Sequence, residues 1–349
     1  MYIPLFKKIY SYFRIYELTD KLFYFKFVRI MKKLLLTSIA LLMAASSFAL
    51  EYEPTWRRAD WRPVGNLMIS SAAVDDYSEL RKKTQNWPIP PEDLDRSVLT
   101  RNAFVEYMGE SLKKKYPSYS VKQPYTLTND IATTDSVKGI QYLYRSNIIF
   151  FAGHGFQQKL AFYNDTMSVN VKAFGGDIKW VFIDACEVLN VNKSGQLDKA
   201  LTSSTKDVNK FNKLKDAFIG VHAILGYYSL GWQYPNNSKP NASHRSELKY
   251  KYFAKYFIED GMTVWNAYKK AHQDYYKEVD DVYYKNNQEH IIGFKPAIAY
   301  MKGKDQYGRS HDASTETYAK TYEVALDPRK TDRSYTLNIL YQEYGVPQY

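Results

Sequence analysis

The sequence has 349 residues, a formal net charge of +11 and 45% hydrophobic residues. Residues 1–49 hold eight Lys/Arg and two Asp/Glu, so the remaining 300 residues carry a net charge near +5. Because no block of five or six like charges remains, the charge pattern excludes an extended nucleic-acid-binding surface. The length suits one large core or two small ones.

The first part of the chain has the pattern of a secretory signal peptide. Residues 31–33 (Met-Lys-Lys) form a charged start, residues 34–45 are apolar, and residues 46–49 (Ser-Ser-Phe-Ala) resemble a cleavage site. The apolar run is too short to span a bilayer. We therefore expect cleavage near Ala49, no stable membrane span afterwards, and a secreted or periplasmic protein. The basic stretch 1–30 is either an over-long start before Met31 or an extended n-region.

Strands and helices alternate along the rest of the chain. Strands are predicted at residues 65–73, 119–127, 148–151, 181–183, 221–226 and 296–300, and helices at 99–115, 130–144, 211–218 and 246–278, the last broken near Gly261. The runs 148–151 and 181–183 are unbroken and apolar, as in strands buried on both faces of a parallel sheet. The alternation predicts an α/β domain over residues 50–314, with helices on both faces of a mostly parallel sheet. The polar tail 315–349 is an extension that the pattern leaves unplaced.

Two reactive side chains follow these two buried runs. His154 lies in Gly-His-Gly after the first run, and Cys186, the only cysteine, lies in Asp-Ala-Cys after the second. Functional groups gather beyond the carboxyl ends of strands in an open parallel sheet. If the two strands are neighbours, the imidazole can accept the thiol proton and leave a nucleophilic thiolate. The alternative for a single cysteine is a buried packing residue.

Gly155, next to the histidine, has a separate predicted role. Without a Cβ it lets a substrate approach the backbone, and its N–H can turn towards a carbonyl oxygen. Together with the N–H of Cys186 it would form an oxyanion hole for cleavage of an amide.

The order His-Gly, then an apolar run ending in Asp-Ala-Cys, resembles the caspase-like cysteine peptidases: caspases, legumains, gingipains and the CHAT group. The resemblance covers about residues 64–302. Residues 261–268 (Gly-Met-Thr-Val-Trp-Asn-Ala-Tyr) also look like the start of a helix in CHAT-type members. The resemblance implies a caspase-like three-layer sandwich, a catalytic His154–Cys186 dyad, and a protein or peptide substrate.

The resemblance further implies three substrate-binding residues. Asp184 matches the position that lines the S1 pocket, where an acidic side chain favours a basic or uncharged polar P1 residue. The other reading of a strand-end aspartate is a cap for the helix that follows. Tyr228 and Ser229 match the opposite wall of the pocket. Glu187 departs from the family, in which glycine often follows the nucleophile closely, and its charge would raise the pKa of Cys186 if it faced the thiolate.

Motifs for other chemistries are missing from the sequence. There is no metal-binding, P-loop or dinucleotide motif and no serine-hydrolase elbow, so we expect neither a metal nor a cofactor. The first hypothesis is an exported cysteine peptidase or amide hydrolase, and hydrolysis of small amides is one form of it. The second hypothesis is a catalytically inactive caspase-like domain that serves as a surface binding module. Glu187, next to the cysteine, is the feature that favours it. The sequence does not indicate an oligomeric state.

Overall fold

The structure, a computed structural model of the chain, describes a large part of the sequence. The described residues are 61–62, 65–85, 90–138, 146–156, 159–168, 178–190, 218, 221–229, 247–287, 294–304, 308, 310–322 and 336–344. All of them belong to one unit of the chain, Asp60–Tyr349. The predicted signal peptide and the stretch before it lie outside the described residues, as does the predicted helix at 211–218 except for Phe218.

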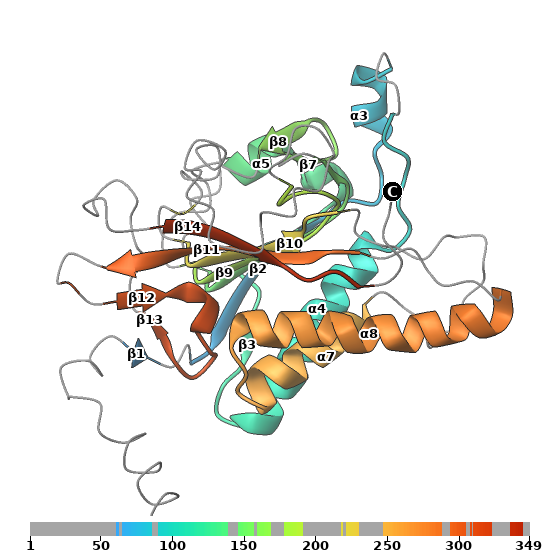
Figure 1. Ribbon diagram of the computed structural model, residues 1–349. Helices are drawn as coiled ribbons and strands as arrows, with labels where there is room; N and C mark the ends of the chain where they lie inside the picture. Colours follow the sequence, from blue (N-terminus) through green and yellow to red (C-terminus); the bar gives the residue numbers. More distant parts are fainter. Residues whose placement is uncertain are drawn as a thin grey trace, which may run out of the picture. The chain divides into compact units, whose positions relative to one another are not determined.

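A mostly parallel sheet forms the centre of this unit (Figure 1). In spatial order its strands are β12 (Ser310–Asp312), β11 (Pro296–Lys304), β10 (Ala223–Tyr227), β9 (Trp180–Asp184), β5 (Ile148–Ala152), β2 (Leu67–Ala73) and β3 (Val121–Lys122), with β4 (Thr126–Thr128) also on β2 and β14 (Thr336–Tyr341) also on β11. The pairs from β10 through β9 and β5 to β2, and on to β3 and β4, are parallel, whereas β11 is antiparallel to its neighbours. The strand predicted at 119–127 is thus two short strands.

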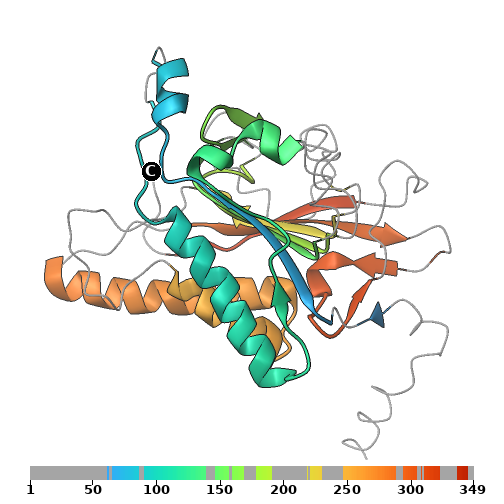
Figure 2. The same cartoon turned by 180° about the vertical axis from the view of Figure 1, so that it is seen from behind.

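Helices and a small second sheet cover the two faces. One face carries α4 (Ser97–Lys115), α7 (Leu248–Ala254) and α8 (Val264–Asn287), and the other carries α5 (Thr134–Lys138) with β6 (Gly155–Phe156), β7 (Lys159–Ala161) and β8 (Thr166–Ser168). Seen from behind, α4 lies along β2 and β5 (Figure 2). A π-helical stretch, Lys255–Glu259, follows α7, and the chain breaks before α8 at Gly261 (φ +68°), as predicted. The α/β three-layer class is confirmed.

Three shorter elements complete the description. The helix α3 (Ser78–Lys83) follows β2, and β1 (Trp61–Arg62) pairs with β13 (Thr321–Tyr322). Single 3-10 turns occur at Asn129–Ile131 and Ala313–Thr315. Among the described residues, no helix combines the length and the hydropathy that a membrane span requires.

Side-chain alternation along the strands separates two cores. On β9, Trp180 and Phe182 belong to the core beneath α4, α7 and α8, while Val181 and Ile183 belong to the core on the opposite face. All five residues of β5 and of β9 are buried, which confirms that the apolar runs are strands covered on both faces. Because the period is two, Asp184 falls on the α7 face.

The tail after residue 314 contributes to the central sheet. β14 pairs with β11 over six residues, from Ala297↔Tyr341 to Lys302↔Thr336. Ile339 is 5% exposed and joins the core on the α5 side of the sheet. The tail therefore covers one edge of β11.

We expect truncation of this tail to destabilise the protein strongly. Ending the chain after residue 335 removes β14, and each large apolar side chain it buries contributes about 1.5–3 kcal/mol. Ending it after Tyr344 keeps β14 and serves as the matched control. Thermal unfolding should give a melting temperature near that of the full chain for the control only. Equal melting temperatures for both truncations would contradict a structural role for β14.

Candidate active site

The two strand ends that carry His154 and Cys186 are adjacent. β5 and β9 pair in parallel up to Ala152↔Asp184, so each of the two residues lies two positions past the same pair. The N–H of Gly153 donates to the carbonyl of Asp184 at 3.2 Å, which continues the contact beyond the strands. The neighbouring strand ends on which the dyad depends are confirmed. The dyad itself stays a prediction.

Gly155 packs directly against the backbone of the Cys186 loop. A Cβ on Gly155 would lie 2.7 Å from the carbonyl oxygen of Cys186, 2.8 Å from Ala185 Cβ and 2.8 Å from Val188 Cγ1, so only glycine fits. Its missing side chain therefore allows the start of β6 to contact the Cys186 loop. The approach of a substrate at Gly155 stays a prediction. The oxyanion hole built from the N–H groups of Gly155 and Cys186 remains a prediction.

Two contacts fix the position of His154. Its backbone N–H donates to the hydroxyl of Tyr77 at 2.7 Å, and the two rings pack with their centroids 4.8 Å apart. Its ring nitrogen Nε2 lies 2.9 Å from the backbone carbonyl oxygen of Glu92. Because a carbonyl oxygen only accepts, Nε2 carries a proton, and Nδ1 is the acceptor of the neutral ring.

The surroundings of His154 set its charge. Burial lowers the pKa of His154 below its usual range, and the hydrogen bond to the Glu92 carbonyl opposes that shift. The ring is therefore neutral at neutral pH and able to take up a proton at Nδ1.

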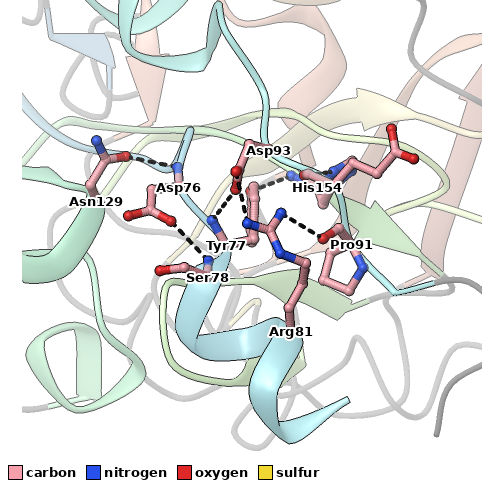
Figure 3. A network of polar contacts seen from close by, with 9 residues as sticks. Asp76, Tyr77, Ser78, Arg81, Pro91, Asp93, Asn129 and His154 are labelled. Atoms are coloured by element: carbon pink, nitrogen blue, oxygen red, sulfur yellow. Dashed lines mark hydrogen bonds and ion pairs between the residues drawn. The ribbon is translucent and has the colours of Figure 1, made fainter. Parts of the chain in front are cut away.

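A polar network links His154 to the loop that precedes α4 (Figure 3). The N–H of Tyr77 donates to Asp93 Oδ1 at 2.8 Å, and Arg81 of α3 donates to Asp93 Oδ2 at 2.8 Å and to the carbonyl of Pro91 at 3.3 Å. The hydrogen bond from Arg81 lowers the pKa of Asp93. Sequence reasoning missed these residues. The one available signal was the position of Tyr77, four residues past β2, the strand beside β5.

Further contacts hold the β2 end of this network. The Asp75 carboxylate accepts the N–H of Ser97 at 2.7 Å, at the start of α4, although burial raises the pKa of Asp75. The side-chain oxygen of Asn129 accepts the N–H of Asp75 at 2.8 Å, and the Asp75 carbonyl accepts the N–H of Leu94 at 2.8 Å. The ends of β2 and β4 and the start of α4 are thereby joined.

Asp184 lies in a buried ion pair. Its Oδ1 is 2.8 Å from Lys249 Nζ of α7, and the side chains of the two residues are 4% and 1% exposed. A cation of the chain itself thus neutralises the carboxylate. The expected preference for a basic P1 residue loses its electrostatic basis. The capping alternative is not seen either, because no helix begins in the described residues directly after β9.

The ion pair continues into a chain of hydrogen bonds. Lys249 also donates to the Tyr227 hydroxyl at 2.8 Å, which lies 3.0 Å from His272 Nε2. His272 Nδ1 donates to the carbonyl of Tyr268 at 2.8 Å, so its Nε2 accepts from Tyr227. Burial, together with the charge of Lys249, lowers the pKa of His272 to about 3. The chain connects α8 to the strand end two residues before Cys186.

The two residues predicted at the opposite pocket wall differ in placement. The Ser229 carbonyl accepts the N–H of Glu187 at 2.9 Å, and its hydroxyl accepts the N–H of Lys295 at 2.8 Å. Ser229 therefore lies beside the Cys186 loop. Tyr228 is 2% exposed, and its ring stacks on Tyr341 of β14 with centroids 4.9 Å apart. Its side chain belongs to the hydrophobic core on that face of the sheet, and its place in a pocket wall stays a prediction.

Glu187, directly after the cysteine, has a left-handed backbone conformation with φ +53°. For a residue with a Cβ this conformation costs about 1–2 kcal/mol. Burial also raises the pKa of its carboxyl group. The departure from glycine noted in the sequence therefore falls on a position whose backbone favours glycine. In the part of the chain that the structure describes, no group of three His, Cys, Asp or Glu could hold a metal ion.

The buried ion pair gives a prediction for stability. Lys249→Met leaves the Asp184 carboxylate buried without its cation, and we expect the free energy of unfolding to fall by about 3–5 kcal/mol. Adding Asp184→Asn removes the uncompensated charge and should restore most of the loss. Lys82→Met, which breaks an exposed pair with Glu79, is the control and should leave the free energy of unfolding nearly unchanged. Urea unfolding measures all three, and equal losses for the two lysine variants would refute this assignment.

The conformation of Glu187 gives a second prediction. Glu187→Gly and Glu187→Ala both remove the carboxylate, but only glycine relieves the left-handed backbone. We expect the glycine variant to be more stable than the alanine variant by about 1 kcal/mol. The comparison is made by urea unfolding at one pH, and an alanine variant as stable as the glycine variant would contradict it.

Comparisons with known proteins give a family and a weak structural likeness. A family profile described as a domain of unknown function (DUF6345) matches residues 92–318. A search of curated proteins gives no match. Two solved structures of a secreted C11 cysteine protease from Bacteroides thetaiotaomicron are similar to this chain. The one in complex with an irreversible peptide inhibitor has 11% sequence identity and a TM-score of 0.34, over 67% of this chain and 66% of that chain.

The second structure, named iotapain, has 8% identity and a TM-score of 0.36, over 68% of this chain and 67% of that chain. The chain thus spans just under two thirds of the length of the first of these proteins. Likeness at this level indicates neither an activity nor a substrate. Because the family profile covers more than half of the sequence, the chain belongs to the family described as a domain of unknown function, DUF6345.

Proposed function

We propose that this protein is an exported cysteine peptidase or amide hydrolase in which His154 and Cys186 form the catalytic dyad. The observation that carries this proposal is the parallel pairing of β5 with β9 up to Ala152↔Asp184. It brings an imidazole and the only thiol of the chain to the same edge of the sheet, where functional groups of α/β proteins gather. The signal-peptide pattern of residues 31–49 supports export.

The contacts of His154 suit a general base. Its Nε2–H is held by the Glu92 carbonyl at 2.9 Å, so Nδ1 presents a lone pair for the thiol proton. The lowered pKa of His154, caused by burial, keeps the ring unprotonated at neutral pH before it takes up that proton. The Glu92 carbonyl then stabilises the imidazolium that forms.

The proposed reaction follows from these roles. The Cys186 sulfur, having given its proton to His154 Nδ1, attacks the amide carbonyl carbon and forms a C–S bond. The N–H groups of Gly155 and Cys186 receive the oxyanion. As the C–N bond breaks, His154 returns the proton to the leaving amine. Water, activated by the same imidazole, then hydrolyses the thioester and releases the acid.

The substrate is a protein, a peptide or a small amide, and its side-chain preference is not set by the charge of Asp184. That carboxylate is paired with Lys249 and 4% exposed. Ser229 is the better candidate for a substrate contact, because its carbonyl bonds to the residue after Cys186. The second candidate function, a catalytically idle binding module, is favoured by one observation, the half-buried Glu187 beside the cysteine.

Alkylation of Cys186 separates the two functions. With a dyad, iodoacetamide modifies the native protein at pH 7, and His154→Asn slows the reaction about 10-fold or more because the base is gone. In that variant the rate should rise only as pH approaches about 8.5, the pKa of an isolated thiol. Cys186→Ala gives the background, and His311→Asn, on β12, is the matched control and should react like the wild type.

Mass spectrometry of the alkylated site measures these rates. Hydrolysis of a peptide and amide library should be lost in Cys186→Ala and in His154→Asn. A wild-type thiol that reacts only after denaturation, with no hydrolysis of any library member, would leave the binding module as the function.

A further inference from the structure

We propose that Arg81 and Asp93 are positioning residues for His154: their ion pair holds the Glu92 carbonyl against Nε2 and thereby selects the tautomer of the ring. The consequence for Cys186 rests on the proposed function, whereas the positioning of His154 does not. Arg81 lies on α3, and Glu92 and Asp93 lie in the loop that leads to α4, outside the strands β5 and β9 that precede the dyad residues.

The guanidinium of Arg81 spans the residue that bonds to His154. One nitrogen donates to the carbonyl of Pro91 at 3.3 Å and another to Asp93 Oδ2 at 2.8 Å, so the residues before and after Glu92 are held by one rigid group (Figure 3). A planar fork of donors fixes two acceptors at once, which a lysine ammonium on a flexible stem does not.

Tyr77 holds both the loop and His154 in position. Its backbone N–H donates to Asp93 Oδ1 at 2.8 Å, while its hydroxyl accepts the backbone N–H of His154 at 2.7 Å. Tyr77 is fully buried, so this reference point is rigid. Both partners of the Glu92–His154 hydrogen bond are therefore placed by one side chain and its backbone.

A third contact fixes the far side of the loop. The N–H of Leu94 donates to the Asp75 carbonyl at 2.8 Å, at the end of β2. The short stretch from Pro91 to Leu94 is thus held by Arg81, by Tyr77 and by the end of β2. Little freedom remains for the Glu92 carbonyl to turn away from the ring.

The chemical consequence concerns which nitrogen of His154 carries the proton. A neutral imidazole has two tautomers, and only the one with Nε2–H can donate to the Glu92 carbonyl. Without that acceptor the two tautomers mix, and Nδ1 is protonated for part of the time. A ring with Nδ1–H cannot accept a thiol proton at that nitrogen.

The direction in which the pKa of His154 shifts separates two effects of removing Arg81, the loss of a charge and the loss of a hydrogen bond. The titratable groups on the neighbouring segments include Asp75, Asp76 and Tyr77 after β2, Glu92 and Asp93 in the loop, and Cys186 and Glu187 after β9. Of these, Glu92 and Asp93 raise the pKa of His154. Removing the Arg81 cation by itself makes the surroundings more negative, which raises the pKa of His154. The hydrogen bond to the Glu92 carbonyl raises the pKa of His154, so losing this bond lowers that pKa.

The ion pair can be removed without unfolding the protein. The side chains of Arg81 and Asp93 are 35% and 54% exposed, and pairs with this exposure contribute little to stability. Lys82→Ala removes one positive charge from the same helix and breaks only the exposed pair with Glu79, so it is the matched control. Arg81→Lys keeps the charge but loses the fork.

The experiment is a pH titration of the full chain labelled with ring-¹⁵N histidine, followed by NMR. The chain has six histidines, and His154→Asn assigns the signal. We expect the wild type and Lys82→Ala to show one tautomer, with the proton on Nε2. Arg81→Ala should show averaged nitrogen shifts and a lower pKa of His154, and Arg81→Lys should lie between them.

An unchanged tautomer in Arg81→Ala, or a raised pKa of His154, would overturn this inference. Failure of the proposed function would look different, because the nitrogen shifts report on the ring whether or not Cys186 reacts. If the dyad is active, alkylation of Cys186 at pH 7 should slow in Arg81→Ala and stay at the wild-type rate in Lys82→Ala.

Discussion

The parallel pairing of β5 with β9 determines which side chains enter each core and where the two strand ends lie. Its register sends Trp180 and Phe182 to one core and Val181 and Ile183 to the other. A slip of one residue would exchange the two sets, because side chains alternate with a period of two. The hydrophobic pattern of the strands thus sets the place of His154 and Cys186, although neither residue belongs to a strand.

Much of the fold could be predicted from the sequence, since strands buried on both faces leave a signal that is local and strong. The two apolar runs ended where β5 and β9 end to within one residue. β14 left no such signal, because it is only partly buried and lies in a tail that is rich in polar residues. The division of the predicted strand at 119–127 depends on separate pairings with β2, which no local pattern records.

The sequence predicted only those site residues that have a reactive side chain and also follow a buried strand. His154 and Cys186 stand out because each follows an apolar run. The acceptor for His154 is a backbone carbonyl, which every residue has, so no side-chain pattern could identify Glu92. The ion pair of Asp184 was not predictable for a similar reason. Its partner Lys249 is 65 residues away, and only the sheet face and the position of α7 bring the two together.

The late position of β14 in the chain has a consequence for synthesis. Thirty-one residues separate Lys304 at the end of β11 from Thr336 at the start of β14. β11 is therefore complete and leaves the ribosome before the strand that covers its edge. A nascent chain at that stage presents unsatisfied backbone groups beside apolar side chains, the kind of surface that chaperones bind and that pairs wrongly with other chains. Folding of this protein therefore includes an interval in which β11, the longest strand in the described residues, has an open edge.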